Sequence, residues 1–110
     1  MCGILGTINL DFDNKLLGFI SHRGPDGAGI IKDIVGNHTI TLAHRRLSIV
    51  DLSPAGNQPM QTTDGKCIIT YNGEIYNHQI FRNELRNIQF KGHSDTETVL
   101  YYLRKKASTL

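Results

Sequence analysis

Cys2 is the first residue whose type and position suggest chemistry. Its side chain is small enough for an aminopeptidase to remove Met1, which would leave a thiol and a free α-amino group on one residue. An α-amine with an ordinary pKa of about 7.7 to 8.0 is partly neutral at cellular pH, so it can act as a general base for its own side chain. Cys2 could therefore supply both nucleophile and base, and the alternative is an incidental cysteine after a start codon.

Five blocks of sequence carry a resemblance to a known family. The blocks are 1–6 (MCGILG), 22–27 (HRGPDG), 43–51 (AHRRLSIVD), 71–77 (YNGEIYN) and 92–97 (GHSDTE). Any one block could arise by chance, but five in order over nearly the whole chain are specific. The chain resembles the class II glutamine amidotransferases, whose N-terminal cysteine hydrolyses glutamine. Within that class it is most similar to the glutaminase domain of asparagine synthetases.

The resemblance implies acyl transfer in two halves. Cys2 would attack the side-chain amide of glutamine to form a thioester and release ammonia, and water would then release glutamate. Asn72 and Gly73 would form the oxyanion hole, the first through its side-chain amide and the second through its backbone N–H. The Asn72-Gly73 pair after a strand is also typical of a hairpin turn, and the two interpretations can hold together.

The resemblance also implies contacts to the two charged ends of glutamine. Arg46 would bind the α-carboxylate, Asp95 would bind the α-ammonium group, and Glu74 would contact the substrate in a role left open. Without the resemblance, Arg46 could be a solvated surface charge. Asp95 could instead stabilise the N-terminus of a helix through its negative charge, because Ser94 and Glu97 around it have the spacing of a capping box.

Other residues that stand out are interpreted as structural. We expect His22, Arg23 and Asp26 to have no chemical task, with Asp26 bonded to the backbone of the turn at 24–27. Cys67 lies in an expected strand and is interpreted as an inert buried thiol. Since the chain has no Cys-x-x-Cys or His-Glu-x-x-His spacing, we expect no metal site.

A small set of strands and helices must position these residues. Apolar and β-branched residues predict a strand over 3–10 that begins beside Cys2, and a hairpin with arms at 29–35 and 38–43 around Gly36-Asn37. The other expected elements are a turn at 11–14, a short helix at 15–21, a loop at 45–64, a strand at 67–71, a helix with Phe81, Leu85 and Ile88 on its apolar stripe, and a helix with Val99, Leu100 and Leu103 on its stripe.

These elements predict an α+β fold. The resemblance implies the αββα sandwich of antiparallel sheets typical of N-terminal nucleophile hydrolases, only partly present here. Residues 1–110 would form a partial class II glutamine amidotransferase domain. The synthetase domain that follows in the family is expected to be absent, since the chain has no phosphate-binding glycine loop. No cofactor is expected in this chain, and ATP and Mg²⁺ are expected only in the missing synthetase domain.

Composition and charge limit other classes of function. The net charge is +2, and the basic cluster Arg104-Lys105-Lys106 ends an expected helix, which favours helix-terminal cations over a nucleic-acid surface. The chain shows no leader pattern and no apolar run of about 20 residues, so we expect no membrane partner. We expect a cytoplasmic protein whose two cysteines are thiols.

Two functions remain open. The first is the glutaminase part of an asparagine synthetase, which hydrolyses glutamine for asparagine biosynthesis or a related amidation and is completed by a separate chain with the rest of the glutaminase and the synthetase domain. The second is a non-catalytic truncated remnant or binding module of the same family. Incomplete sheets would leave strand edges and a sheet face exposed, which favours partnering or aggregation. The chain would then be a truncated product, a fragment or one part of a split enzyme.

Overall fold

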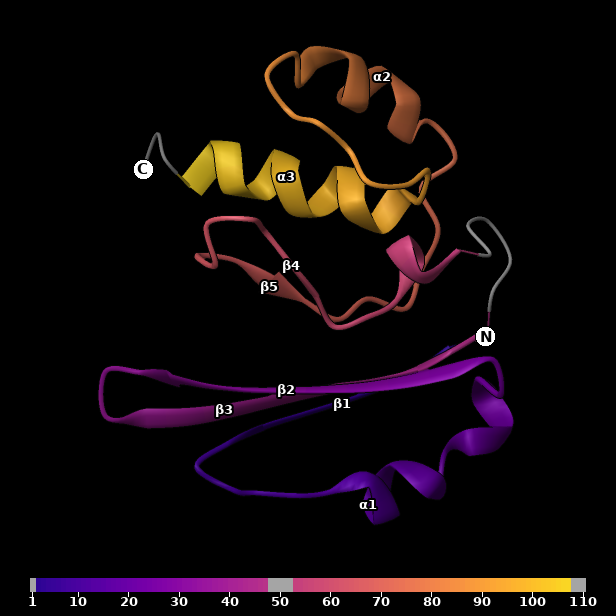
Figure 1. Cartoon of the computed structure of the whole chain (residues 1–110), viewed down its shortest axis with the longest axis vertical. Coiled ribbons are helices and arrows are strands. Elements are labelled where there is room, and N and C mark those ends of the chain that lie inside the picture. Colours follow the sequence, from indigo (N-terminus) through magenta and orange to yellow (C-terminus); the bar gives the residue numbers. More distant parts are fainter. Residues whose placement is uncertain (1, 48–52, 108–110) are drawn as a thin grey trace.

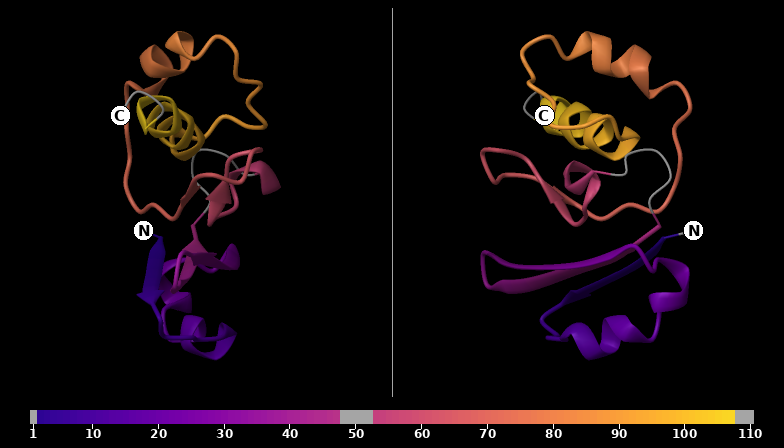
Figure 2. Two further views of the ribbon diagram at one scale, coloured as in Figure 1. Left: turned by 90° about the vertical axis from the view of Figure 1, so that its left-hand side faces the viewer. Right: turned by 45° about the vertical axis from the view of Figure 1, so that its right-hand side comes forward.

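Helices and sheets form stacked layers in the computed structural model, which describes residues 2–47 and 53–107. From the bottom to the top of Figure 1 these layers are helix α1 (Asn14–Gly18), a three-stranded sheet, a two-stranded sheet, and helices α3 (Asp95–Ala107) and α2 (His78–Glu84). The turned views in Figure 2 keep the same order. The predicted mixture of helices and antiparallel sheets is therefore confirmed.

The first half of the chain forms the three-stranded sheet. Its strands β1 (Gly3–Ile8), β2 (Gly27–Val35) and β3 (His38–Arg46) pair antiparallel in the order β1-β3-β2. The predicted hairpin is confirmed, since β2 and β3 pair along their full lengths and Gly36 has a φ of +61°, the sign that a primed turn requires. Both arms are longer than predicted, because the pairing continues past the apolar residues to Gly27 and Arg46.

The register of this sheet brings the start of the chain to the end of β3. Gly3 pairs with Arg45, and Gly27 of β2 pairs with Arg46 from the other side. Cys2 precedes Gly3, so it lies beside the last residues of β3. The sheet therefore holds the predicted nucleophile and the predicted carboxylate-binding arginine near one end.

Helix α1 and the short 3-10 helix η1 (Ser21–Arg23) lie along one face of the sheet (Figure 1). Asp13 caps α1 by accepting the Lys15 N–H at 2.9 Å. The predicted helix over 15–21 is thus divided in two, because α1 ends at Gly18, a residue with low helix propensity. The apolar core between α1 and the sheet consists of Phe12, Leu17 and Ala43, with Leu5, Ile20 and Ile30 packed against it.

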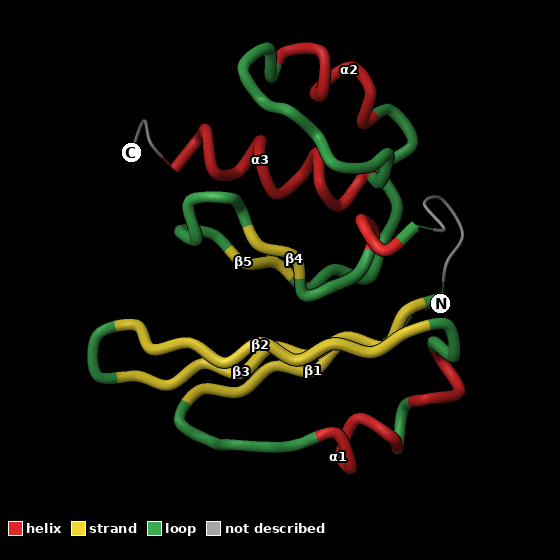
Figure 3. Tube along the Cα trace, viewed as in Figure 1, coloured by secondary structure: helices red, strands yellow, loops and turns green. Residues whose placement is uncertain are grey.

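The second sheet is much smaller than the sequence predicts. Strands β4 (Met60–Gln61) and β5 (Ile68–Ile69) pair antiparallel, and Figure 3 shows them as short segments between loops. The strand predicted over 67–71 is shortened because side chains, not a strand ladder, take the backbone N–H groups of its end residues. The predicted loop over 45–64 also contains the end of β3 and the 3-10 helix η2 (Pro54–Gly56), while its residues 48–52 lie outside the described ranges.

The apolar stripes predicted for the last two helices are only partly correct. Helix α2 ends at Glu84, so Ile88 lies beyond it. In α3, Leu100 is buried but Leu103 is 56% exposed, and the buried face includes Tyr101 and the polar first turn. Side-chain hydropathy could not predict this face, because that turn packs through hydrogen bonds. None of the helices in the described part of the chain is long and apolar enough to cross a membrane.

Candidate active site

One pocket collects all six predicted site residues. It has a volume of about 250 Å³ and lies where five segments meet: the start of β1, the end of β3, the stretch from the end of η2 to β4, the segment after β5 and the first turn of α3. The predicted residues that line it are Cys2, Arg46, Asn72, Gly73, Glu74 and Asp95. The remaining lining residues are His44, Leu47, Gly56, Gln58, Tyr71, Ser94 and Thr96. Residues from five separate segments therefore meet in one small cavity.

Cys2 is held from two sides. Its Sγ accepts a hydrogen bond from the Leu47 N–H at 3.3 Å and lies 3.7 Å from the Leu47 carbonyl oxygen, which can accept the thiol hydrogen. On the other side, Arg23 Nε donates to the Cys2 carbonyl oxygen at 3.3 Å. Arg23 therefore has a specific task that the sequence analysis did not assign, and its place in the 22–27 block was the available signal.

Asn72 and Gly73 lie in a segment without regular secondary structure and not in a hairpin turn. Neither residue is part of a turn, and Gly73 does not have the positive φ of a primed turn, so the turn interpretation is wrong. Both residues are exposed, and both line the pocket. A Cβ at position 73 would lie 2.7 Å from the Tyr71 hydroxyl oxygen, so glycine lets the Tyr71 ring lie against this segment.

Arg46 is buried, with only 8% of its surface exposed, so the solvated-charge interpretation is wrong. Its Nη1 donates to the Ser53 carbonyl oxygen at 2.8 Å and to Asn57 Oδ1 at 2.7 Å. Within residues 2–47 and 53–107, the Arg46 guanidinium has no other hydrogen-bond partner. Its Nε and Nη2 atoms form the edge of the guanidinium that can pair side-on with a carboxylate.

Two acidic residues, Asp95 and Glu74, also line the pocket. Asp95 is buried, and its Oδ2 accepts the Ile75 N–H at 2.8 Å, which occupies one of the two carboxylate oxygens. Burial raises the pKa of the Tyr71 hydroxyl above its ordinary value, and the charges of Asp95 and Glu74 raise it further. The pocket therefore presents a cation at Arg46 and two anions near Tyr71.

His44 also lines the pocket, although the sequence analysis assigned it no role. It is 1% exposed, and its Nε2 lies 3.3 Å from the Tyr71 carbonyl oxygen. Burial lowers the pKa of His44 below its ordinary value of 6.5, the bond to Tyr71 opposes that shift, and the charge of Arg46 adds to it. Because a carbonyl only accepts, Nε2 of the neutral ring carries the hydrogen, and Nδ1 has no partner within the described ranges.

The capping box predicted before α3 is half formed. Ser94 Oγ accepts the Glu97 N–H at 3.2 Å, as the pattern requires. The Glu97 carboxylate instead accepts the N–H groups of Lys91 and Gly92 at 2.9 and 3.0 Å. Glu97 therefore fixes the loop that leads into α3, and with it the position of Asp95.

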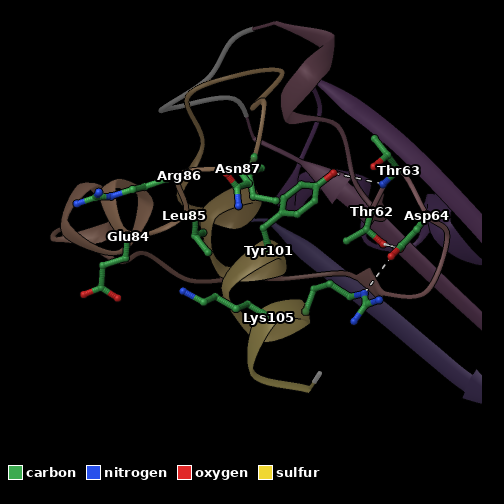
Figure 4. Close-up of a pocket in the computed structure, with 11 residues that line it drawn as sticks. Thr62, Thr63, Asp64, Glu84, Leu85, Arg86, Asn87, Tyr101 and Lys105 are labelled. Atoms are coloured by element: carbon green, nitrogen blue, oxygen red, sulfur yellow. Dashed lines mark hydrogen bonds and ion pairs between the residues drawn. The ribbon is translucent and has the colours of Figure 1, made fainter. Parts of the chain in front are cut away.

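A larger pocket lies away from these residues. It has a volume of about 560 Å³ and is formed by the β4–β5 connection, the end of α2 and the outer part of α3 (Figure 4). Thr63 N–H donates to the Tyr101 hydroxyl across it, and Arg104 pairs with Asp64 at 3.1 Å. The hydrogen bond from Thr62, with smaller contributions from Lys66 and Arg104, lowers the pKa of Asp64 to about 2. None of the predicted site residues lines this pocket.

Cys67 differs from the expectation of a buried thiol. It is half-buried, and it does not line the pocket that contains Cys2. Its backbone N–H donates to Thr62 Oγ1 at 3.2 Å, which is a structural contact. Over the residues that the structure describes, no three His, Cys, Asp or Glu side chains are grouped in a way that could hold a metal ion.

Comparison with known proteins gives a family match and a set of relatives. Residues 1–109 match the model of the glutamine amidotransferase domain family. A protein of Schizosaccharomyces pombe named as a probable glutamine-hydrolyzing asparagine synthetase is 42% identical over 114 aligned positions, which cover 96% of this chain and 20% of that protein. Asparagine synthetase 1 (glutamine-hydrolyzing) of Arabidopsis thaliana is 36% identical and is matched over 92% of this chain and 18% of its own length.

A third relative has a different name. Amidase chyE of Penicillium rubens is 47% identical over 85 aligned positions, which cover 76% of this chain and 12% of that protein. The chain thus spans about a fifth or less of the length of these relatives. The family match over residues 1–109 includes every residue that lines the 250 Å³ pocket.

Proposed function

Because this chain belongs to the glutamine amidotransferase domain family, we propose that it hydrolyses glutamine to glutamate and ammonia as the glutaminase part of an asparagine synthetase or a related amide-forming enzyme. One observation carries the proposal. A thiol, two candidate oxyanion donors, a buried arginine and a buried carboxylate line the same 250 Å³ pocket. These are the groups that amide hydrolysis of a zwitterionic amino acid requires.

The first half of the reaction forms a thioester. After removal of Met1, the α-amine of Cys2 takes the thiol proton, and sulfur attacks the carbonyl carbon of the glutamine side-chain amide. The C–N bond then breaks, and the Cys2 ammonium group gives its proton to the leaving ammonia. In the second half, the same amine takes a proton from water as that water attacks the thioester, and glutamate and the free thiol are released.

Asn72 and Gly73 would stabilise the charge that develops on the amide oxygen. Both are exposed, and no hydrogen bond to a described residue competes for the Asn72 side chain. A donor that is already in place when the oxyanion forms is worth roughly 3 to 4 kcal/mol of barrier. This part of the proposal is supported by the position of both donors in the pocket lining and outside any turn.

Arg46 and Asp95 would recognise the two charges of the glutamine backbone. The Nε and Nη2 edge of Arg46 fits the α-carboxylate, and the second oxygen of Asp95 fits the α-ammonium group. Glu74 adds negative charge on the ammonium side. Specificity for a free amino acid would follow, because a peptide-bonded glutamine lacks both charges.

The stacked layers support a place for this chain within an αββα sandwich. The order of helix, sheet, sheet and helices in Figure 1 is the order such a fold needs, and the strands present would form part of its two sheets. We propose that further polypeptide, in the same or a separate chain, supplies the other strands and a synthetase that uses ATP and Mg²⁺. The ammonia formed here would be consumed there.

The direct test is ammonia release from glutamine by the purified protein, alone and with any polypeptide that completes it. Intact mass should show that Met1 is absent, and Cys2→Ala should abolish release while Cys67→Ala preserves it. A glutamine-like diazo-ketone should label Cys2 faster than the half-buried Cys67. No release in any assembly, together with equal labelling of the two thiols, would favour the non-catalytic binding module.

A further inference from the structure

The segment that carries the candidate oxyanion donors has no secondary structure of its own. Residues 72–74 are exposed, and no backbone N–H or carbonyl of these three residues forms a hydrogen bond with another described residue. The position of the segment is therefore decided at its two ends, by Tyr71 before it and by Ile75 after it.

The backbone N–H and the backbone carbonyl of Tyr71 are both held by side chains from other parts of the chain. Its N–H donates to Gln58 Oε1 at 2.6 Å, and its carbonyl oxygen accepts from His44 Nε2 at 3.3 Å. The chemistry fixes how Gln58 is oriented, because an N–H needs an acceptor and only the amide oxygen can accept. The Gln58 amide nitrogen consequently faces away from Tyr71, where it donates to Thr96 Oγ1 at 3.2 Å.

The other end of the segment is tied to the same helix turn. The Ile75 N–H donates to Asp95 Oδ2 at 2.8 Å, and Thr96 is the next residue of α3. Gln58 thus connects the start of the donor segment to the turn that holds its end. This connection also joins the candidate oxyanion hole to the candidate ammonium-binding carboxylate.

Gln58 itself is held firmly in place. An ideal Cβ at Gly29 would lie 2.2 Å from the Gln58 carbonyl oxygen, so the backbone at 58 packs directly onto β2 at a position where only glycine fits. A second tie, from Thr70 Oγ1 to the Ala43 carbonyl oxygen at 3.2 Å, anchors the residue before Tyr71 to β3. Gln58 and Thr70 are therefore attached to the three-stranded sheet, and through them so is the start of the segment at 72–74.

We propose that Gln58 and His44 are positioning residues that hold the Tyr71 peptide groups and thereby aim Asn72 and Gly73 at the reacting amide oxygen. The inference rests on the proposed function, since the aim of the donors affects a rate only if an oxyanion forms. Gln58 and His44 act through Tyr71 and need not touch glutamine. Their effect belongs to the transition state, so it should appear in kcat more than in KM.

The test compares Gln58→Met with Gln58→Glu in the purified protein, with Gln89→Met on the exposed surface as the control. Methionine has a similar length and no acceptor strong enough to hold the Tyr71 N–H, whereas glutamate keeps an oxygen there. We expect Gln58→Met to lower kcat for glutamine hydrolysis roughly 10- to 100-fold with KM changed by less than about twofold. Gln58→Glu should recover most of that loss, and Gln89→Met should match the wild type.

A second pair of variants tests the carbonyl side. His44→Gln places an amide N–H near the position of Nε2, whereas His44→Leu removes the donor. We expect His44→Leu to reduce kcat and His44→Gln to retain more of it. Parallel losses of activity in both variants, each matched by an equal loss of thermal stability, would show a merely structural role and overturn this half of the inference.

Amide hydrogen exchange separates this inference from the proposed function. Gln58→Met should speed exchange at the hydrogen-bonded amides of Tyr71 and Ile75 while α3 and the three-stranded sheet keep their protection, and Gln58→Glu should not. Unchanged exchange at Tyr71, or faster exchange throughout the chain, would overturn the positioning role. If the wild type releases no ammonia, the proposed function fails, but the exchange comparison still decides whether Gln58 fixes this segment.

Discussion

Arg46 and Asn72 line the same pocket but should contribute to different steps. Arg46 would contact the α-carboxylate equally in the ground state and the transition state. Arg46→Lys replaces a planar fork with a point charge, so we expect KM for glutamine to rise roughly 10- to 100-fold with a smaller change in kcat. Arg86→Lys, on the exposed rim of the other pocket, is the matched control.

Steady-state kinetics with thermal melts decide the outcome for Arg46. The lysine variant also loses the bonds from Nη1 to Ser53 and Asn57, so its melting temperature must be measured beside KM. A loss of stability that fully accounts for the lost activity would remove Arg46 from the substrate site.

Asn72→Ala should have the opposite kinetic signature. The Asn72 side chain has no hydrogen-bond partner among the described residues, so its removal should change the free energy of unfolding by less than about 0.5 kcal/mol. Because its donor is engaged only as the oxyanion forms, kcat should fall roughly 10²- to 10³-fold with little change in KM. Asn87→Ala provides an exposed control, and a large drop in stability of Asn72→Ala would contradict the assignment.

His44 should make stability depend on pH. Its pKa in the folded protein is lowered from 6.5, chiefly by burial, so the unfolded chain binds the proton more readily. The free energy of unfolding should therefore be highest above pH 6.5, fall as the pH drops through 6.5, and level off below the folded pKa. Urea titrations at several pH values over this range should show that the free energy of unfolding depends less on pH in His44→Gln, because glutamine cannot titrate. If the free energy of unfolding changes equally with pH in the variant and the wild type, other groups cause the pH dependence.

Alanine substitutions at Gly29 in β2 and at Gly18 in α1 should have contrasting effects on stability. A Cβ at Gly29 would collide with the Gln58 carbonyl, so Gly29→Ala should lower the free energy of unfolding by about 1 to 3 kcal/mol. A Cβ at Gly18 meets nothing within 4 Å and lies in α1, so Gly18→Ala should be neutral or stabilising by up to about 1 kcal/mol. Denaturant midpoints compare the two, and similar values for both variants would contradict the close approach of 58 to β2.

Local patterns predicted some elements well. The β2–β3 hairpin was predictable because alternation and the Gly36-Asn37 pair act between neighbouring residues. The buried face of α3 was not, since its first turn is buried through hydrogen bonds such as those of Glu97 with the 91–92 loop. Hydropathy does not record that kind of packing.

The candidate site likewise has features that the sequence predicted and features that depend on contacts between distant residues. The resemblance named six residues that the fold brings to one pocket, with Cys2 and Arg46 placed by the strand register. The turn at Asn72-Gly73 was wrong because distant side chains at positions 44 and 58 hold the backbone before it. Gln58 could not be found from the sequence, since it lies outside the five blocks and its role depends on contacts up to 38 positions away.

The whole molecule exposes apolar side chains along both outer strands of its larger sheet. β1 and β2 are edge strands, and Ile8 on β1 is 65% exposed, with Ile4, Ile34 and Val35 exposed as well. We expect concentration-dependent association of the isolated chain, and Ile8→Lys should reduce it because a lysine on an edge opposes strand pairing. Light scattering measures the effect. Gln89→Lys adds the same charge away from the edge, so equal improvement in both variants would point to net charge instead.

The position of Cys2 also decides how the protein can be handled as a reagent. Cys2 lines the pocket at the first residue before β1, whereas the exposed Lys105 lies about 15 Å along the axis of α3 from Asp95, at 1.5 Å per residue. A purification tag fused ahead of Cys2 would crowd the pocket and block the α-amine. A dye or a surface linker on the last turns of α3 would leave the pocket clear, so an immobilised glutamine sensor should be attached through that helix.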